Sequence, residues 1–313
     1  MIELPVPLYQ RLYKLCNDVS VTDLQKERAA LTAQYHGHGE VRMHTRAQRL
    51  SYLATRMPST YAALCAVLSF VPDLDQMTSL LDLGSGPGTV LWALKGKAPL
   101  QKATLVEQDS DLLSLSKDLW EEDAALSVTH QKENLLSYQS TEPADLVTIS
   151  YVWGELDPTR RFEFLEKVYE NTLQYLVLVE PGTPHHYQGL LEARAFLLEK
   201  GAQMVAPCPH AGMCPLKAPD WCHFSVAVKR EALHRQVKEA HHPFELEKYS
   251  YLIVSKQNRD LPQGRLVRPP LKRSGHVILD VCDASGALIR KTVTKKDKHL
   301  YQAFKKKEWG DAL

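Results

Sequence analysis

Three cysteines lie close together in one proline-rich segment of this 313-residue chain. Cys208, Cys214 and Cys222 are separated by five and by seven residues, with three prolines and one glycine among the residues between them. This composition predicts a rigid loop without long helices or strands. Thiolates are soft ligands that suit zinc or an iron–sulfur cluster, and both usually take four ligands. The segment therefore predicts a metal site whose fourth ligand has three candidates: Cys282, His210 and His223.

The spacing of these cysteines leaves the identity of the metal open. The paired C-x-x-C knuckles typical of zinc sites are absent, and so is the C-x-x-x-C-x-x-C signature of radical S-adenosylmethionine enzymes. Buried free thiols are the simplest alternative, because a disulfide framework is not expected in a chain that is not exported. If Cys282 completes the site, it joins two distant parts of the chain, and metal binding becomes part of folding.

A glycine-rich segment has the composition of a cofactor-binding turn. The residues Leu80-Leu-Asp-Leu-Gly-Ser-Gly-Pro-Gly-Thr-Val predict a strand that runs into a tight turn and opens a helix. Gly84, Gly86 and Gly88 allow the backbone to approach a ligand because they carry no Cβ. The G-x-G-x-G spacing differs from the G-x-G-x-x-G of pyrophosphate binders. It favours S-adenosylmethionine, whose methionine and ribose parts would lie over the loop.

Polar residues near the ends of neighbouring strands complete this candidate cofactor site. Glu107 ends the next predicted strand, 23 residues after Gly84, where a carboxylate accepts hydrogen bonds from both ribose hydroxyls. Asp82 precedes the loop and either orients it or reaches the methionine ammonium group through water. Asn134 follows the third predicted strand, close to where the adenine would lie. The alternative is a Rossmann-like domain that keeps its glycines only for packing.

A methyltransferase also needs a group that handles the methyl acceptor, and here the sequence departs from known patterns. The Asn-Pro-Pro-Tyr or Asp-Pro-Pro-Tyr tetrad of amino-methylating enzymes is missing, and Ser150-Tyr-Val-Trp-Gly-Glu-Leu stands in its place. Tyr151 or Trp153 could stack on a base and Glu155 could act on a proton, although core packing explains both aromatic side chains about as well. Tyr151 and Glu155 are therefore the candidate catalytic residues.

The elements that must position these groups follow from hydrophobic patterning. From residue 79 onward, short apolar runs alternate with helical segments, which is typical of a parallel sheet with crossover helices. The chain is thus expected to adopt an α/β class I (Rossmann-like) S-adenosylmethionine methyltransferase fold that is closed by a final hairpin. Strands are expected at 79–83, 103–107, 146–150, 175–180, 201–206 and 224–229, and helices at 111–122, 160–171 and 187–200.

Three regions are expected along the chain. Residues 1–70 form a helical N-terminal extension, because their apolar residues recur with a helical period. Residues 71–230 hold the Rossmann-like methyltransferase domain, with the cysteine-rich loop at 205–225. Residues 231–313 form a basic, β-rich C-terminal region that contributes Cys282. Its short strands are expected at 248–254, 265–267, 276–282 and 288–294.

Charge is distributed unevenly along the chain. Residues 251–313 hold 14 of the 38 Lys and Arg and 6 of the 37 Asp and Glu, a net charge of +8, so the remaining residues carry −7. A basic end on an acidic body indicates a surface that faces a polyanion such as RNA, and the alternative is a solvated helix face. Tyr301, Phe304 and Trp309 could add stacking on bases. The lysines predicted to contact RNA are Lys295, Lys296, Lys298, Lys305, Lys306 and Lys307.

The sequence predicts a folded protein away from the membrane. A hydrophobic content of 44% and a charged content of 24% are those of an ordinary globular domain. No run of eighteen apolar residues predicts a membrane span. Glu3 stands among the first residues, where a signal or transit peptide would be basic and apolar. We therefore expect a soluble protein that is not exported.

Several motifs together carry a family resemblance over about residues 55–313. They resemble the methyltransferase-like assembly factors of the mitochondrial small ribosomal subunit and the bacterial relatives of those factors. The motifs are Leu81-Asp-Leu-Gly-Ser-Gly-Pro-Gly-Thr-Val-Leu-Trp-Ala, Glu180-Pro-Gly-Thr-Pro, Cys214-Pro-Leu, Asp220-Trp-Cys-His-Phe-Ser and Gly275-His-Val-Ile-Leu-Asp-Val-Cys.

The resemblance implies ligands and a function. It implies that Cys208, Cys214, Cys222 and Cys282 hold a [4Fe-4S] cluster rather than zinc, and that the glycine loop binds S-adenosylmethionine. It further implies a protein that binds the small ribosomal subunit or its rRNA and supports assembly or translation. The alternatives are a catalytically active rRNA methyltransferase and an iron–sulfur sensor that regulates RNA binding. With Glu3 among its first residues, the sequence is nearer the bacterial relatives, so we expect a cytoplasmic protein, or one of the mitochondrial matrix if it is a processed organellar relative.

Overall fold

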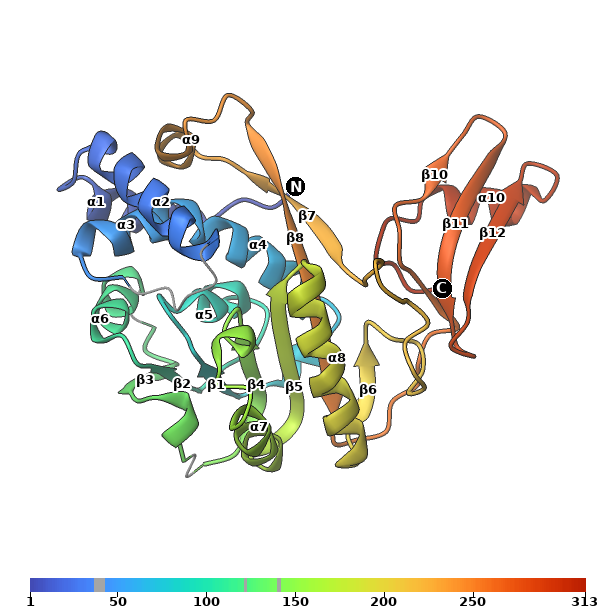
Figure 1. Ribbon diagram of the computed structural model, residues 1–313, viewed down its shortest axis with the longest axis horizontal. Helices are drawn as coiled ribbons and strands as arrows, with labels where there is room; N and C mark the ends of the chain where they lie inside the picture. The colour runs from blue at the N-terminus through green and yellow to red at the C-terminus, as the bar shows by residue number, and fades with distance from the viewer. Residues whose placement is uncertain (37–42, 121–122, 140–141) are drawn as a thin grey trace.

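The computed structural model describes residues 1–36, 43–120, 123–139 and 142–313, and within them the chain builds two β-sheets of unequal size (Figure 1). The large sheet has the strand order β3-β2-β1-β4-β5-β8-β6, and β7 pairs with β8. Its strands are β1 (Ser79–Leu83), β2 (Lys102–Glu107), β3 (Ser127–Lys132), β4 (Ala144–Ser150), β5 (Thr172–Pro181), β6 (Gln203–Ala206), β7 (Phe224–Lys229) and β8 (Phe244–Ser255).

The first five strands of the large sheet run parallel, and β8 runs antiparallel to β5, β6 and β7. The central strands are apolar and buried because helices cover both faces of the sheet, as parallel sheets require. This arrangement confirms the Rossmann-like α/β architecture predicted from the sequence. The connecting elements are α5 (Thr89–Leu94), α6 (Ser110–Leu119), α7 (Arg161–Glu170), α8 (Pro184–Glu199) and the short helices η1 (Leu74–Gln76), η2 (Leu135–Ser137) and η3 (Trp153–Glu155).

The strand order creates a binding edge. The chain places β2 and β3 on one side of β1, then crosses to place β4 and β5 on the other side. In open α/β sheets, ligands bind outside the carboxyl ends of the strands at the point where the order reverses. The glycine turn follows β1 directly, and it therefore lies at this point.

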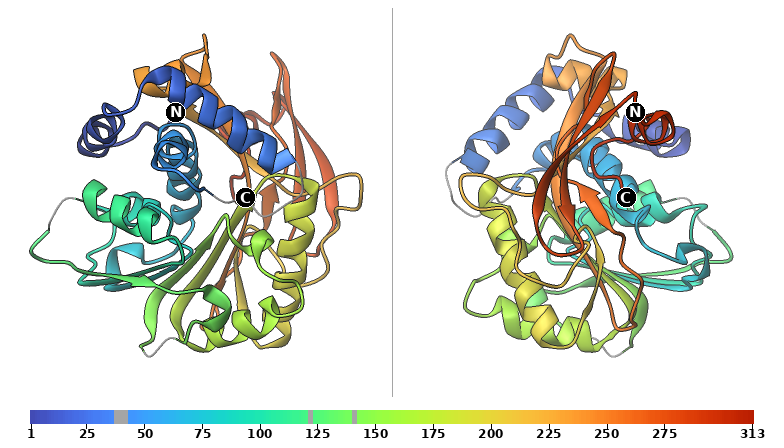
Figure 2. Two further views of the ribbon diagram at one scale, coloured as in Figure 1. Left: turned by 60° about the vertical axis from the view of Figure 1, so that its left-hand side comes forward. Right: turned by 90° about the vertical axis from the view of Figure 1, so that its right-hand side faces the viewer.

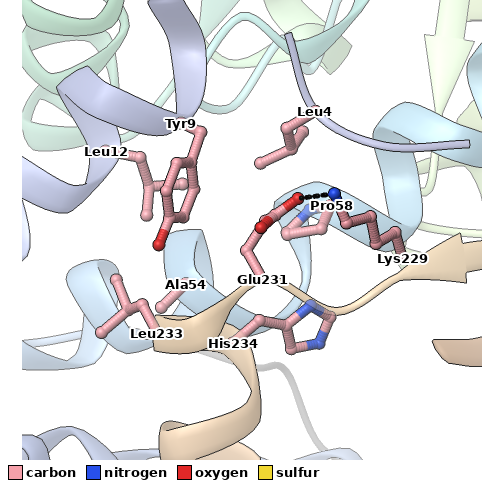
Figure 3. A pocket seen from close by; sticks show the side chains of 9 residues that line it. All are labelled: Leu4, Tyr9, Leu12, Ala54, Pro58, Lys229, Glu231, Leu233 and His234. Atoms are coloured by element: carbon pink, nitrogen blue, oxygen red, sulfur yellow. Dashed lines mark ion pairs between the residues drawn. The ribbon is translucent and has the colours of Figure 1, made fainter. Parts of the chain in front are cut away.

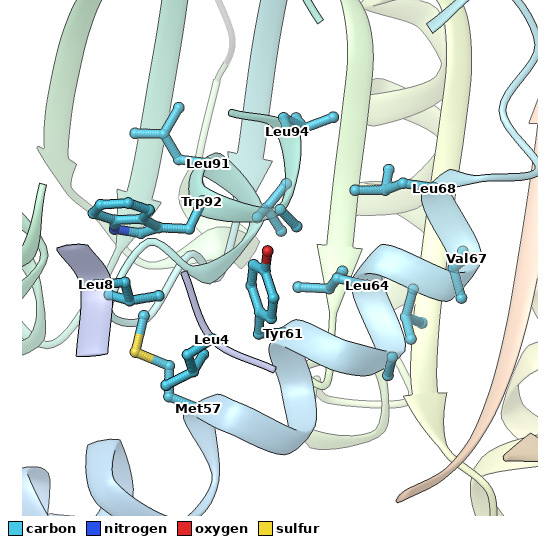
Figure 4. Close-up of a cluster of buried hydrophobic side chains, with 14 of the residues drawn as sticks. Leu4, Leu8, Met57, Tyr61, Leu64, Val67, Leu68, Leu91, Trp92 and Leu94 are labelled. Atoms are coloured by element: carbon cyan, nitrogen blue, oxygen red, sulfur yellow. The ribbon is translucent and has the colours of Figure 1, made fainter. Parts of the chain in front are cut away.

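Four helices precede the large sheet: α1 (Val6–Cys16), α2 (Val21–His36), α3 (Arg46–Thr55) and α4 (Met57–Leu68). They lie over the same face as α5 (Figures 1 and 2). Almost all of α4 is buried, and Figure 4 shows Met57 and Leu64 of this helix in one apolar cluster with Leu91 and Trp92 of α5. The helices expected before residue 70 are present, and they share the core of the large sheet. No described helix is both long and apolar enough to cross a membrane.

The small sheet lies at one end of the molecule, beyond β6 and the end of β7 (Figure 1). Its strand order is β10-β11-β12, with β9 paired to β11. Val277, Leu279 and Tyr301 belong to its separate apolar core. The elements of this part are β9 (Gly264–Leu266), β10 (Leu271–Lys272), β11 (His276–Asp283), β12 (Leu288–Thr294) and α10 (Lys298–Lys305). Helix α9 (Ala232–Lys238) precedes β8 and packs against α2 and α3 instead.

Strand β8 lies in the large sheet, although its place in the sequence suggested the C-terminal β-rich region. The closing hairpin was expected from residues 201–206 and 224–229, but the strand between β5 and β6 is β8. The second half of β8, from Tyr249 to Ser255, is buried and pairs with β5, and its last residues also pair with β6; the first half pairs with β7 and is partly exposed. A strand pattern shows which residues are buried, but it does not show which sheet buries them.

Candidate cofactor site and cysteine centre

The glycine turn after β1 is closed by the backbone of β2. The N–H groups of Gly84 and Ser85 both donate to the carbonyl of Val106, at 2.9 and 3.0 Å. A Cβ at Gly88 would lie 2.5 Å from Oγ of Ser116 in α6, so this glycine is required for close packing. A Cβ at Gly86 would meet nothing within 4 Å. Gly86 therefore leaves open space over the turn, where a ligand would lie.

The acid at the end of β2 is held against this turn. Oε2 of Glu107 accepts a hydrogen bond from the N–H of Gly86 at 3.0 Å, and Oε1 accepts one from Asp109 at 2.9 Å. Burial raises the pKa of Glu107, and these backbone donors oppose the rise. Each carboxylate oxygen has a second lone pair, so Glu107 can still accept hydrogen bonds from a ligand. The ribose role of this residue stays a prediction.

Buried polar atoms without a partner gather near the carboxyl ends of β1 and β4. Oδ1 of Asp82 accepts a hydrogen bond of 2.7 Å from Thr148, but its Oδ2 has no partner among the described residues. The same holds for Oγ of Ser85 and Oγ of Ser150. Burial raises the pKa of Asp82 to about 7. Unsatisfied buried groups are rare in proteins, and a cluster of them fits a polar ligand such as the methionine part of S-adenosylmethionine.

The last predicted cofactor residue lies at the carboxyl end of β3. Oδ1 of Asn134 accepts a hydrogen bond from the N–H of Leu136 and so caps η2, while its Nδ2 donates to Oε1 of Gln108 at 3.1 Å. Gln108 directly follows Glu107. The structure therefore places the six predicted cofactor residues in or after β1, β2 and β3, at one edge of the sheet.

The candidate catalytic residues follow β4, in a segment that is largely engaged in packing. Tyr151 has a left-handed backbone, with a φ of 61°, and its hydroxyl donates to Glu247 at 3.3 Å. Burial and the charge of Glu247 raise the pKa of this phenol, which keeps it protonated. Trp153 is fully buried and its indole donates to the carbonyl of Gly189, so it is a packing residue. Glu155 is exposed in η3.

The sequence did not predict that a buried acid, Glu180, binds the segment after β4. Glu180 ends β5, and it accepts hydrogen bonds from the N–H groups of Trp153 at 2.9 Å and Gly154 at 3.3 Å. Burial raises its pKa to about 8. His186 in α8 lies 3.8 Å from the same carboxyl group. An acid at the end of an apolar run was the only available signal, and it does not reveal which loop the acid binds.

Four cysteines meet between the two sheets: Cys208, Cys214, Cys222 and Cys282, which we call the cysteine centre. Burial raises the pKa of the Cys222 thiol well above its usual range, and the other three thiols raise it further. Burial likewise raises the pKa of Cys282 to about 12, with further contributions from Cys208 and Cys214. Thiols affect one another in this way only when they are close in space. The structure thus brings Cys282 of β11 to the three cysteines of the loop.

Of the two histidines that were alternative fourth ligands, His210 contacts a cysteine of the centre and His223 has a different partner. Nε2 of His210 lies 3.3 Å from Sγ of Cys282, and Nδ1 of His223 lies 3.2 Å from the carbonyl of Trp221, on whose ring it also stacks. Among the residues that the structure describes, no group of three or more His, Cys, Asp or Glu side chains is arranged to hold a metal ion. The metal site predicted from the sequence therefore stays a prediction.

Two cavities lie away from both of these sites. Figure 3 shows the first, which is lined by Leu4, Tyr9, Pro58 and His234 among others and has a volume of about 10 Å³. This volume holds about one water molecule, so the cavity is too small for a cofactor. The second is a groove of about 210 Å³ near the amino ends of β1 and β2, opposite the edge that carries the glycine turn.

The aromatic residues of the basic end are less accessible than the sequence suggested. Tyr301 is only 2% exposed, so its ring is not available to stack on a base. Trp309 packs against Phe224 and His223. Nζ of Lys307 donates to the carbonyl of Ala312 at 2.7 Å. The other predicted RNA-contacting lysines lie at exposed positions in or beside β12 and α10.

Comparisons with known proteins agree on one family. The family model described as "Rsm22: Mitochondrial small ribosomal subunit Rsm22" matches residues 46–313. The chain is 25% identical to the Rsm22-cox11 tandem protein 2, mitochondrial, of Schizosaccharomyces pombe, covering 96% of this chain and 47% of that protein. It is 26% identical to the human ribosome assembly protein METTL17, mitochondrial, covering 88% of this chain and 64% of that protein. The chain thus spans about half to two thirds of the length of these two relatives.

Among solved structures, the magnesium protoporphyrin IX methyltransferase ChlM of Synechocystis PCC 6803 with bound S-adenosylmethionine is similar, with a TM-score of 0.43 and 10% identity. That similarity covers 74% of this chain and 97% of ChlM.

Proposed function

The chain belongs to the Rsm22 family of the mitochondrial small ribosomal subunit, and from this membership we propose that it binds the small ribosomal subunit or its rRNA and supports assembly or translation. The observation that carries the proposal is the extent of the family match. It runs from residue 46 to residue 313, and so it includes the large sheet, the cysteine centre and the basic small sheet in one unit.

We propose that the edge of the large sheet binds S-adenosylmethionine. Glu107 would accept hydrogen bonds from the ribose, Asp82 would face the methionine ammonium group, and Asn134 would lie near the adenine. The open space over Gly86 and the partnerless oxygen of Asp82 support this assignment. The cofactor supplies a methyl group when it serves as a donor. In a structural role, it would instead stabilise the sheet edge by binding only the folded state.

The assembly role is favoured over catalysis by the segment after β4. A methyl acceptor needs a nearby group that orients it or takes a proton. The Tyr151 hydroxyl is engaged with Glu247, and burial raises the pKa of this phenol, so it stays protonated and cannot take a proton. Glu155 remains as a candidate. An active rRNA methyltransferase is therefore the second candidate function, and transfer of labelled methyl groups to small-subunit RNA by the wild-type chain would establish it.

We propose that the cysteine centre holds a [4Fe-4S] cluster, with zinc as the alternative. The support is the donor set, because four cysteine thiols near one another are ligands for either group. A single zinc ion needs all its sulfurs within about 2.3 Å of one point. A [4Fe-4S] cluster binds each thiolate to a different iron, so its sulfurs lie further apart. The preference for the cluster over zinc comes from the family resemblance of the four cysteines.

A sensing role for this centre is a further candidate. Cys282 lies in the small sheet, while the other three cysteines lie in the loop that joins β6 to β7. Loss of the bound group would release the small sheet from this loop and weaken its binding to RNA. Equal RNA affinity with the centre occupied and emptied would rule this role out.

The RNA-binding surface is proposed to be the exposed lysines of the small sheet and α10. Each phosphate that a lysine neutralises releases counterions, so the affinity should fall steeply with salt. The aromatic rings add little to this proposal, since Tyr301 is buried and Trp309 is half-buried against Phe224.

The proposed compartment is the mitochondrion. The curated relatives are named as mitochondrial proteins, which supports the organellar alternative, whereas nothing among them supports the cytoplasmic, bacterial expectation.

The test of the proposed function is sedimentation of the purified chain with small ribosomal subunits. We expect the wild-type chain to sediment with the small subunit and not with the large one. We expect Gly86→Ala, which would block the cofactor site, to sediment equally well if the role is structural. Absence of any binding to subunits or rRNA at low salt would refute the proposal.

A further inference from the structure

Two arginines lie buried beside the cysteine centre without a carboxylate partner. Arg194 in α8 is 6% exposed and Arg265 in β9 is 3% exposed. Within the described parts of the chain, neither forms an ion pair with an Asp or Glu. The third buried arginine, Arg49, behaves differently, because it binds Asp109 at 2.9 Å. A buried cation without a counter-charge is among the most unfavourable arrangements in a protein.

Both guanidinium groups donate hydrogen bonds to backbone carbonyls of the loop between β6 and β7. Nη2 of Arg194 donates to the carbonyls of His210 and Gly212, at 2.9 and 2.8 Å. Nε of Arg265 donates to the carbonyl of Pro207 at 2.8 Å. Nε of Arg194 is buried without a partner among the described residues. Carbonyl groups satisfy hydrogen bonds but carry no net charge, so the two positive charges stay unbalanced.

These arginines come from two different parts of the fold. Arg194 comes from the large-sheet domain, and Arg265 stands opposite Cys282 in the register of β9 and β11. Burial raises the pKa of the Cys208 and Cys282 thiols. The charge of Arg194 opposes both rises, and the charge of Arg265 opposes the rise at Cys208. Arg194 further contacts the loop at His210, whose Nε2 lies 3.3 Å from Sγ of Cys282.

The missing counter-charge matches the charge of the proposed centre. Four thiolates around a dipositive core, either oxidised [4Fe-4S] or zinc, leave a dianion. Two arginines would balance this dianion.

We propose that Arg194 and Arg265 are the internal counter-ions of the anionic group held by the cysteine centre, and that this charge pairing fixes the small sheet against the large-sheet domain. The inference rests on the proposed metal centre. Arg194 anchors the loop from α8, Arg265 anchors the same loop from β9, and the anion between them joins the two. Loss of the bound group would leave two repelling cations at the junction and would loosen β9 to β12.

The experiment compares Arg194→Met, Arg265→Met and Arg194→Lys with the wild-type chain, all purified without oxygen. The control is Arg290→Met, an exposed arginine of the small sheet whose side chain is 62% accessible. The measurements are metal content, the rate of metal loss to excess chelator, and the reduction potential where iron is present. Residues around metal ligands typically change metal affinity by about 10- to 100-fold when mutated.

We expect both methionine variants to lose metal at least about tenfold faster than the wild type, with Arg194→Lys in between and Arg290→Met unchanged. Where iron is present, we expect a lower reduction potential, because removing a positive charge disfavours the more negative reduced cluster. Unchanged release rate and potential in loaded methionine variants would overturn the proposal. A wild-type chain that holds neither iron nor zinc would instead refute the metal centre itself.

A second measurement uses the wild-type chain alone and does not depend on the stability of a variant. Amide hydrogen exchange is compared before and after chelation. We expect faster exchange in β11 and β12 after the metal is removed, and unchanged exchange in β1 and β4. Equal protection of the small sheet in both states would overturn the proposed coupling.

Discussion

The backbone N–H of Gly86 donates a hydrogen bond of 3.0 Å to the carboxylate of Glu107. The turn after β1 and the acid at the end of β2 are therefore held together by the protein itself. Because a side chain at position 86 would enter the open space beside this acid, Gly86 offers the sharpest test of the cofactor site.

Gly86→Ala should weaken S-adenosylmethionine binding by at least about tenfold, because the new methyl group fills the space over the turn. The matched control is Gly96→Ala, another left-handed glycine with nothing near its Cβ direction. Both substitutions should cost about 1 kcal/mol of stability through backbone strain. Calorimetric titration gives the affinities and thermal unfolding gives the stabilities. Equal loss of affinity in both variants would contradict the assigned site.

Glu180→Gln should change how stability depends on pH. The pKa of Glu180 is raised by burial to about 8 from its usual 4.5. An acid with a raised folded-state pKa contributes most below pH 4.5, and this contribution is lost as the pH rises to about 8. Between pH 5 and pH 8 the wild type should therefore lose about 3 kcal/mol relative to Glu180→Gln. Denaturant unfolding at several pH values measures this difference, and parallel pH profiles would show that Glu180 is ionised throughout.

Cys282→Ser should abolish or strongly reduce metal retention. Three ligands in the loop cannot complete a four-ligand site, and the fourth cysteine comes from β11. Cys65→Ser is the control, because Cys65 lies in α4, away from the cysteine centre. Iron, sulfide and zinc assays on anaerobically purified protein measure the outcome. We expect about four irons per chain in the wild type and in the control. Full metal content in Cys282→Ser would remove this residue from the ligand set.

Removing exposed lysines from the small sheet and α10 should weaken RNA binding and reduce its salt dependence. For each phosphate that is no longer neutralised, the slope of log affinity against log salt should fall by about 0.9 on duplex RNA and by less on single strands. A matched triple variant of the acidic body, with the same charge removed, should bind like the wild type. Filter binding at several salt concentrations measures both quantities, and equal slopes would argue against this surface. The test variant changes Lys296, Lys298 and Lys306 to Ala, and the control changes Lys14, Lys26 and Lys117 to Ala.

The sequence alone determined the local structure around the glycine turn. Strand β1, the glycine turn and Glu107 lie within about 30 residues, and their pattern is contiguous, so local physics specifies how they fold. The strand at 79–83 and the strand at 224–229 were predicted with the bounds that the structure has. The bounds of strand β3 were not predicted, because it is an edge strand with mostly polar residues and so lacks an apolar run.

Only the tertiary structure decided how distant segments meet. It placed β8 inside the large sheet, brought Cys282 to the other three cysteines, and buried Tyr301 inside the small sheet. It also revealed the pairing of Glu180 with the segment after β4 and the two arginines without a carboxylate. A local pattern records which side of an element is buried, but the partner that buries it comes from elsewhere in the chain, and periodicity carries no information about that partner.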